Sequence, residues 1–312
     1  MNLWEKISFF ASNSHPFFCV IDFEGKKGDV VLIENLSDDF LFSIDNESSS
    51  GKTIEMRKLP INFDEYETKI NFIKEQIRSG NTYLANLTQR TKIETKSTLR
   101  EIYDASCAKF KLFYKDKFVC FSPERFVKIE NDKIFTYPMK GTIDAKLPNA
   151  KELILENQKE MAEHTMVVDL LRNDLSIVST NVRVSRFRYV DEIKAGEKNL
   201  LQVSSEICGD LHPQWQNNLG EILKALLPAG SISGTPKKKS LEIIKEIEGY
   251  DREFFTGIFG FFDGKNFDSG VMIRFIQKDG DDLYYKSGGG ITLDSDNLSE
   301  YQEMLDKVYI PV

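Results

Sequence analysis

Three segments of the chain combine residue types that could do chemistry. One is the glycine-rich stretch Gly230-Ser-Ile-Ser-Gly-Thr-Pro-Lys237, which leads into a predicted helix. Backbone N–H groups at a helix start bind anions, and lysines in that first turn are disfavoured unless an anion is present. The stretch lacks the Gly-Lys-Ser/Thr ending of a nucleoside-triphosphate-binding loop. It therefore indicates either an anion site or a solvated basic face.

Two pairs of glutamates share a spacing of three residues, Glu160 with Glu163 and Glu300 with Glu303. On a helix this spacing places both side chains of a pair on one face. Four carboxylates from two helices could hold Mg²⁺ through few direct bonds and several waters. The structural alternative is that acidic residues near a helix start complement the helix dipole, and it is strongest for the second pair.

A lysine follows a predicted strand in the segment Tyr137-Pro-Met-Lys-Gly-Thr142. Lys140 at such a strand end could act as a nucleophile if burial lowered its pKa. The alternative is an ordinary surface lysine, and the segment by itself favours that alternative.

The hydrophobic pattern predicts the elements that carry these segments. Apolar residues on one face predict a helix at about 65–79, capped by Asp64 and closed by Gly80. Further helices are expected at about 151–172, after Thr235 as N-cap, and at about 299–308. Strands are expected at 17–23, 30–34, 83–91, 118–121, 125–129, 134–136, 181–190, 200–209, 256–262, 269–277 and 283–286. Strands in groups with helices between the groups favour an α+β fold with antiparallel sheets.

Composition excludes several classes of protein. The 312 residues carry a formal net charge of −8, which argues against a nucleic-acid-binding protein. No apolar run approaches the ~18 residues of a membrane span, and the N-terminus lacks the pattern of a secretory signal. The four cysteines are scattered without CxxC spacing, as in a reduced cytoplasmic protein. With 41% hydrophobic residues and 23 Phe, the chain has ample apolar material for a large core.

Eight blocks, taken in chain order, resemble the chorismate-utilising enzymes, a family that includes anthranilate, aminodeoxychorismate, isochorismate and salicylate synthases. The resemblance runs from about residue 62 to the end, and the order of the blocks makes it specific. The blocks are Gly80–Thr88, Ser122–Phe126, Thr136–Thr142, Glu160–Leu175, Gly230–Lys237, Phe255–Gly260, Ile273-Arg274, and Gly288–Ser295 with Glu300-Tyr-Gln-Glu303 and Lys307.

The resemblance implies a fold and a domain organisation. We expect an α+β fold of the anthranilate-synthase type, with two large, mainly antiparallel β-sheets packed together and flanking helices. The active site would lie between the sheets. The whole chain, 1–312, would be a single chorismate-binding domain, with a short N-terminal strand region at 1–61 and a catalytic core at 62–312.

The resemblance also implies a metal and a substrate site. Mg²⁺ would be held chiefly by Glu163 and Glu303, with Glu160 and Glu300 supporting it through water, and would bind the ring carboxylate of chorismate. The positions that match substrate-binding residues of the family are Ser231, Lys237, Phe255, Arg274, Gly288, Gly289, Gly290 and Lys307. Phe255 stands where many members carry tyrosine or tryptophan.

Three further positions distinguish members of the family. Lys140 matches a lysine of aminodeoxychorismate synthases, where most anthranilate synthases carry alanine. That lysine is implied to attack C2 of chorismate and expel the C4 hydroxyl, after which ammonia attacks C4 and releases the enzyme. Leu84 replaces the lysine base of members that add water, so isochorismate and salicylate synthases are disfavoured. Gln202, expected near the reaction with Lys140 and Thr142, replaces a histidine and could only hydrogen-bond.

These positions favour aminodeoxychorismate synthase component I, on the route to p-aminobenzoate and folate. Ammonia would come from a separate glutaminase subunit or from solution, because the blocks include no glutaminase. The alternatives are anthranilate synthase component I, in tryptophan biosynthesis, and a non-catalytic chorismate-binding regulatory subunit. The intact glutamate pairs count against the regulatory subunit.

Overall fold

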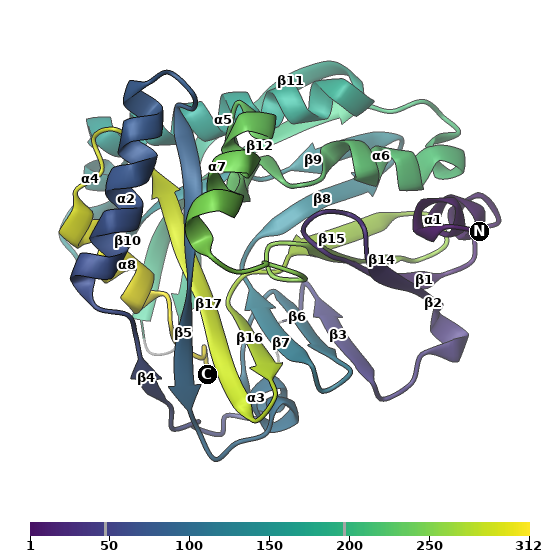
Figure 1. The fold of residues 1–312 in the computed structure, drawn as a ribbon. Coiled ribbons are helices and arrows are strands. Elements are labelled where there is room, and N and C mark those ends of the chain that lie inside the picture. The colour runs from purple at the N-terminus through teal and green to yellow at the C-terminus, as the bar shows by residue number, and fades with distance from the viewer. Residues whose placement is uncertain (47–48, 196–197) are drawn as a thin grey trace.

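The computed structural model describes residues 1–46, 49–195 and 198–312, and within them the strands form two antiparallel sheets (Figure 1). Sheet A contains, in spatial order, β10 (Met139–Asp144), β12 (Lys198–Asp210), β9 (Lys133–Thr136), β8 (Arg125–Glu130), β15 (Phe267–Val271), β14 (Ile258–Phe262), β1 (Phe17–Ile21) and β2 (Gly28–Leu32), with β11 (Thr180–Ala195) also paired to β12. Sheet B contains β13 (Gly234–Thr235), β5 (Leu84–Glu94), β17 (Asp282–Ile291), β16 (Phe275–Asp279), β7 (Phe118–Ser122), β6 (Phe110–Tyr114) and β3 (Phe40–Ile44), with β4 (Arg57–Leu59) also paired to β5.

Strand β1 shows why the chain forms packed layers. All five of its residues are buried, because successive side chains point to opposite faces of the sheet and both faces are covered. Phe17 and Ile21 contribute to the core on the helix-covered face of sheet A. Phe18 and Val20 point the other way, into an aromatic core between the two sheets. In that inner core the rings of Phe118 and Phe275 stack with centroids 4.6 Å apart. The same core contains Phe18, Phe40, Tyr114, Phe255 and Phe259.

Helices cover the outer faces of both sheets. Sheet A carries α1 (Leu3–Ser12), α4 (Ala150–Glu156), α5 (Gln158–Val178) and α6 (Leu219–Leu226). Sheet B carries α2 (Phe63–Arg78), α7 (Lys237–Glu248) and α8 (Asn297–Asp306) over β5 and β17, and α3 (Leu99–Ala105) over β6 and β7 (Figure 1). Short 3₁₀ turns complete the connections: η1 (Ile33–Asn35), η2 (Trp215–Asn218) and η3 (Gly230–Ile232). Every described helix is too short or too polar to span a membrane.

Three predicted helices differ from the observed ones, two because an asparagine caps a helix and one because the predicted cap belongs to a strand. Helix α2 is capped by Asn62, whose side chain accepts from the N–H of Glu65, and the predicted cap Asp64 is already inside the helix. The single helix predicted at about 151–172 is two helices, because Asn157 ends α4 and caps α5. Thr235 is not an N-cap, since it pairs in β13 and α7 begins after Pro236.

The N-terminal residues 1–61 are more than the predicted strand region. They begin with helix α1, and their strands enter both sheets, β1 beside β14 in sheet A and β3 beside β6 in sheet B. The strand predicted at 269–277 is also divided: β15 ends in sheet A and β16 begins in sheet B. Arg274 lies at this crossing with a left-handed backbone, φ 53°.

Candidate active site

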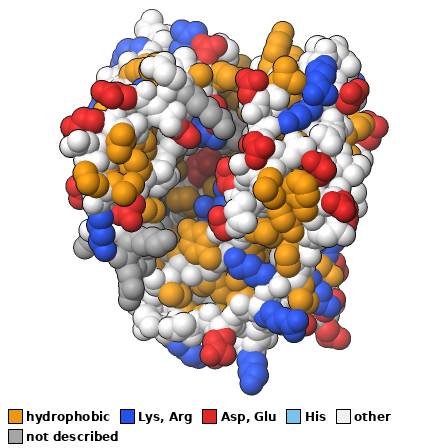
Figure 2. All heavy atoms as spheres, turned by 90° about the vertical axis from the view of Figure 1, so that its left-hand side faces the viewer, with side chains coloured by type: hydrophobic (Ala, Val, Ile, Leu, Met, Phe, Trp, Pro, Cys, Tyr) orange, Lys and Arg blue, Asp and Glu red, His pale blue; other side chains and the backbone are white. Residues whose placement is uncertain are grey.

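A cavity of about 740 Å³ lies between residues of the two sheets and of helix α5 and helix α8. Figure 2 shows this side of the molecule hollowed, with acidic and basic side chains inside the hollow. Of the predicted site residues, Lys237 and Glu300 do not line the cavity. The others do: Lys140, Thr142, Glu160, Glu163, Gln202, Ser231, Phe255, Arg274, Gly288, Gly289, Gly290, Glu303 and Lys307.

Strand β10 brings the three predicted catalytic residues together. Thr142 pairs directly with Gln202 of β12, and Lys140 lies two residues before Thr142 on β10. The Lys140 Nζ atom lies 2.8 Å from a carboxylate oxygen of Glu163 on α5. Although burial opposes it, Glu163 and the nearby Glu303 and Glu160 raise the pKa of Lys140 above its ordinary value. The side chain is therefore held as an ammonium ion.

Gly141 allows β10 to approach α5 this closely. Its φ of 87° is in the region that favours glycine. A Cβ atom there would lie 3.1 Å from Oε2 of Glu160, so a larger residue would crowd that carboxylate. The glycine places Glu160 directly beside the strand that carries Lys140.

Helix α8 supplies the second set of charges. The Lys307 Nζ atom donates to Gly288 O at 2.7 Å and lies 2.6 Å from Glu303. Glu300 accepts from the Ser295 hydroxyl at 2.8 Å, and burial raises the pKa of Glu300. Although burial opposes it, Lys307 and Lys140 hold the pKa of Glu303 below its ordinary value. A Cβ on Gly289 would lie within about 3.6 Å of charged atoms of all three α8 side chains, so the glycine leaves them room.

The four glutamates offer the oxygen donors that a hard divalent cation prefers. Glu160 Oε2 is buried without a hydrogen-bond partner, an acceptor that a cation would satisfy. Within the described residues, no three carboxylate, histidine or cysteine side chains converge as they would around a metal ion, and Glu163 and Glu303 are each bonded to a lysine. The residues therefore fit Mg²⁺ in donor type, and ion binding would have to displace at least one of these lysine contacts.

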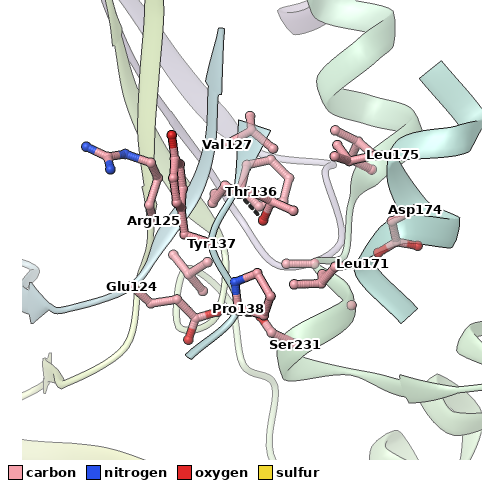
Figure 3. Close-up of a pocket in the computed structure, with 15 residues that line it drawn as sticks. Glu124, Arg125, Val127, Thr136, Tyr137, Pro138, Leu171, Asp174, Leu175 and Ser231 are labelled. Atoms are coloured by element: carbon pink, nitrogen blue, oxygen red, sulfur yellow. Dashed lines mark hydrogen bonds between the residues drawn. The ribbon is translucent and has the colours of Figure 1, made fainter. Parts of the chain in front are cut away.

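Glu124 is a cavity residue that the sequence reasoning did not single out. Ser231 donates a hydrogen bond of 2.5 Å to its carboxylate, and in Figure 3 Glu124 and Ser231 lie on either side of Pro138. Burial raises the pKa of Glu124, although Ser231, Lys307 and Arg274 act in the other direction. A neighbouring pocket of about 20 Å³ shares Glu124 and Ser231 and has room for about one water molecule. The signal was available, since Glu124 lies in the block Ser122-Pro-Glu, in the short connection between the strands predicted at 118–121 and 125–129.

Arg274 and Lys237 differ in their surroundings. Arg274 lines the cavity, and its Nε atom is buried without a hydrogen-bond partner. Lys237 lies 2.9 Å from Asp174 of α5 and also donates to Leu226 O, so its charge is balanced inside the protein. The structure thus separates Lys237 from the other predicted binding residues.

Comparisons with known proteins show which proteins this chain resembles in sequence. The family model for chorismate binding enzymes matches residues 5–311. A Haemophilus influenzae protein named "Uncharacterized PabA-like protein" is 45% identical, covering 99% of this chain and 96% of that protein. Aminodeoxychorismate synthase component 1 of Klebsiella aerogenes is 34% identical over 78% of this chain, which spans only 56% of that relative's length.

A solved structure has the same fold. The crystal structure of anthranilate synthase component I from Streptococcus pneumoniae TIGR4 superimposes with a TM-score of 0.67 at 26% identity, covering 84% of this chain and 60% of that one. The predicted α+β fold, with two antiparallel sheets and flanking helices, is confirmed. By sequence and by fold, the chain belongs to the family of chorismate binding enzymes.

Proposed function

We propose that this protein is an aminodeoxychorismate synthase of the component I type, which converts chorismate and ammonia to 4-amino-4-deoxychorismate and water on the route to p-aminobenzoate and folate. The observation that carries the proposal is the position of Lys140 in the cavity wall, beside Thr142, Gln202 and the glutamates. The similarity to the Klebsiella aerogenes enzyme supports it.

The proposed reaction has two displacements. The Lys140 amine forms a bond to C2 of chorismate while the bond from C4 to its hydroxyl breaks. Ammonia then forms a bond to C4, and the bond from C2 to Lys140 breaks, which returns the free amine. The attacking form is the neutral amine, so Lys140 must first give one proton to Glu163, 2.8 Å away, or to water, and the contact with Glu163 must then open.

Glu124 is the proposed proton donor for the departing hydroxyl. A carboxyl group with a raised pKa keeps its proton at higher pH and can deliver it as the C–O bond breaks, so that water leaves. Ser231 orients it through their hydrogen bond. Thr142 and Gln202, paired across β10 and β12, would position the substrate by hydrogen bonds, since neither titrates near neutral pH.

Mg²⁺ is proposed to bind Glu163 and Glu303 directly, and Glu160 and Glu300 through water. When bound, it would neutralise part of this acidic cluster and attract the ring carboxylate of chorismate. Arg274, Lys307 and the backbone of Gly288–Gly290 are proposed to bind substrate carboxylates, and Phe255 to line the pocket beside them. Lys237, paired with Asp174, has no part in this proposal.

Ammonia is proposed to come from a separate glutaminase subunit. The name of the Klebsiella aerogenes relative, component 1, refers to an enzyme with a second component. In the absence of that subunit, a high concentration of ammonium salt would replace it.

Product analysis by mass spectrometry tests the function. The protein is incubated with chorismate, Mg²⁺ and ammonium chloride, and 4-amino-4-deoxychorismate is the expected product, with no pyruvate. Anthranilate with one equivalent of pyruvate would instead identify an anthranilate synthase. Chorismate binding without any product would indicate a regulatory subunit.

A further inference from the structure

The cavity wall contains a buried lysine to which neither the family resemblance nor the proposed reaction assigns a role. Lys286 lies on β17, is only 2% exposed and lines the cavity. Its neighbour Ser287 donates to Met304 O of α8, whereas Lys286 points to the other face of the strand, toward Phe255 and Phe275 of the core between the sheets. The side chain therefore belongs to the inner surface of the site.

Lys286 differs from the other lysines of the cavity in its partners. Lys140 and Lys307 each lie within 3 Å of a glutamate. Among the described residues, Lys286 and Arg274 are the cavity cations without an ion pair, and the Lys286 Nζ atom donates one hydrogen bond, to Arg252 O at 3.0 Å. A charged ammonium group has two further protons to donate, and a buried one needs a counter-ion.

Lys286 is almost wholly buried at the cavity wall, which strengthens its interaction with any nearby charge. The rings of Tyr250, Phe255 and Phe275 lie 5.3–5.8 Å from its Nζ atom. Such rings stabilise a cation, and a low dielectric makes a nearby anion more effective. The site has the chemistry of a desolvated carboxylate receptor.

The charged groups near Lys286 come from β5, from α7 and from the segment after α7, and they include as many positive as negative side chains. Arg90 of β5 and Arg252, after α7, act against its protonation, while Glu253 and Glu248 act for it. Glu248 is already engaged with Arg252 at 2.6 Å. Burial is the largest effect and lowers the pKa of Lys286 to about 7.

The position in the cavity selects one of the two carboxylates of chorismate. A Cβ atom on Gly289 would lie 3.5–3.6 Å from carboxylate oxygens of Glu300 and Glu303, so these glutamates gather at that point of β17. Lys286 is three residues earlier on the opposite face of the strand, and its Nζ atom lies 5.8 Å from the Phe255 ring. Lys286 therefore lies toward the Phe255 end of the wall, away from the glutamates proposed to hold the ring carboxylate through Mg²⁺. We propose that Lys286 binds the enolpyruvyl carboxylate of chorismate and takes up a proton as it does so. This inference rests on chorismate as the ligand but not on the amination reaction.

Calorimetric titration of the protein with chorismate, in the presence of Mg²⁺ and without ammonia, tests this. Measurements at pH 6, 7 and 8 in two buffers of different ionisation enthalpy give the number of protons taken up. Because the free amine titrates near 7, Lys286 should add about half a proton at pH 7 and nearly one at pH 8.

Two variants of Lys286 and one control separate its role from structural effects. In Lys286→Met this uptake should vanish and Kd should rise about ten- to 100-fold, the value of a charge-assisted hydrogen bond. In Lys286→Arg, whose charge is permanent, uptake should vanish while binding persists, and wild-type affinity should fall with pH above 7 relative to this variant. Lys111→Met is the matched control, because Lys111 is also buried, over Tyr103 and bonded to Ser106 O, but outside the cavity.

Equal proton uptake and equal Kd in wild type and Lys286→Met would overturn the inference. If Lys286→Met does not fold, equal pH dependence of Kd in wild type and Lys286→Arg would overturn it. Chorismate binding with the predicted uptake but no aminated product would leave the inference standing and refute the proposed reaction. No chorismate binding by the unaltered protein would refute both.

Discussion

The ammonium group of Lys140, on strand β10, lies 2.8 Å from the carboxylate of Glu163, on helix α5. The pair joins the residue proposed as nucleophile to a residue proposed as metal ligand. Because Glu163 favours the charged form of Lys140, the amine cannot attack while this contact is intact. Two parts of the proposed chemistry, nucleophile and metal, therefore depend on one ion pair.

Replacing the proposed nucleophile should remove activity without unfolding the protein. Lys140→Ala should lower kcat by about 10³-fold or more, the scale seen when a nucleophile is lost. Product formation is followed by mass spectrometry, and intact-protein mass after incubation with chorismate alone should show an adduct on wild type only. Lys128→Ala, which removes a lysine from a half-buried pair with Glu130 on β8, outside the cavity, is the control. Undiminished product from Lys140→Ala would exclude the covalent route.

Mg²⁺-dependent binding of chorismate should require the glutamates proposed as metal ligands. Glu163→Gln or Glu303→Gln should greatly weaken Mg²⁺-dependent chorismate binding, measured by calorimetry, because each removes a ligand and its charge. Glu160→Gln should have a smaller effect, because its proposed role is through water. Full activity in excess chelator would contradict the magnesium proposal.

If Glu124 is the proton donor, kcat should decrease on the alkaline side of its pH profile. Glu124 must be protonated to act, so kcat should fall as pH rises through its raised pKa. Glu124→Gln should lower kcat by about 10²–10⁴-fold, with a smaller change in KM, and should abolish that limb. The profile is measured at a constant concentration of free NH₃, so that ammonium ionisation does not contribute. An unchanged limb in the variant would assign it to another group.

A buried ion pair beneath the cavity should matter for stability. Glu248 and Arg252 are 3% and 4% exposed, and Arg252 also donates to Ile232 O and Asn86 O. Glu248→Gln leaves Arg252 uncompensated and should lower the free energy of unfolding in urea by about 3–5 kcal/mol. Glu242→Gln breaks an exposed pair with Lys239 and should cost less than about 1 kcal/mol. Equal losses of unfolding free energy in the two variants would mean that burial does not increase the contribution of the Glu248–Arg252 pair to stability.

The described cysteines bear on the source of ammonia. Cys19, Cys120 and Cys208 are buried, so a substrate cannot reach these thiols. Burial also raises the pKa of Cys19 to about 12, which disfavours its nucleophilic thiolate. The purified chain should aminate chorismate with ammonium salt at alkaline pH and give no product with glutamine. Adding the cognate glutaminase should confer glutamine dependence. Turnover of glutamine by this chain alone, lost in Cys107→Ser, would show that it carries its own glutaminase.

Local pattern predicted the elements better than their boundaries. The apolar face of α2 and the apolar run of β1 appear in the sequence, since each depends on neighbouring residues. The break between α4 and α5 was missed because one side chain, Asn157, caps the second helix, whereas the periodicity continues through it. The division of 269–277 between two sheets depends on a backbone turn at Arg274 that the pattern does not contain.

In the site too, the features that depend on neighbouring residues were predicted, whereas those that depend on contacts distant in sequence were not. The spacing of the glutamates predicted that each pair shares a helix face, and the structure places three of the four in the cavity wall. Lys237 was predicted among them, but its partner is Asp174, 63 positions earlier, and no local signal indicates that contact. Glu124 and Lys286 gain their unusual protonation from burial, which arises only once the sheets have packed.

The pairing of β1 with β14 has a consequence for how the chain folds. Phe17 lies opposite Phe262, and in sheet B Ala85 lies opposite Ile291, so each sheet joins an early strand to a late one. Contacts so distant in sequence slow folding, because a long loop must close before they form. During synthesis on the ribosome, β1 cannot pair with β14, nor β5 with β17, until most of the chain has been made. Until then the unpaired edges of β1 and β5 are the places where association with other chains would begin. Chaperone demand during synthesis is therefore a property of the topology rather than of any single residue.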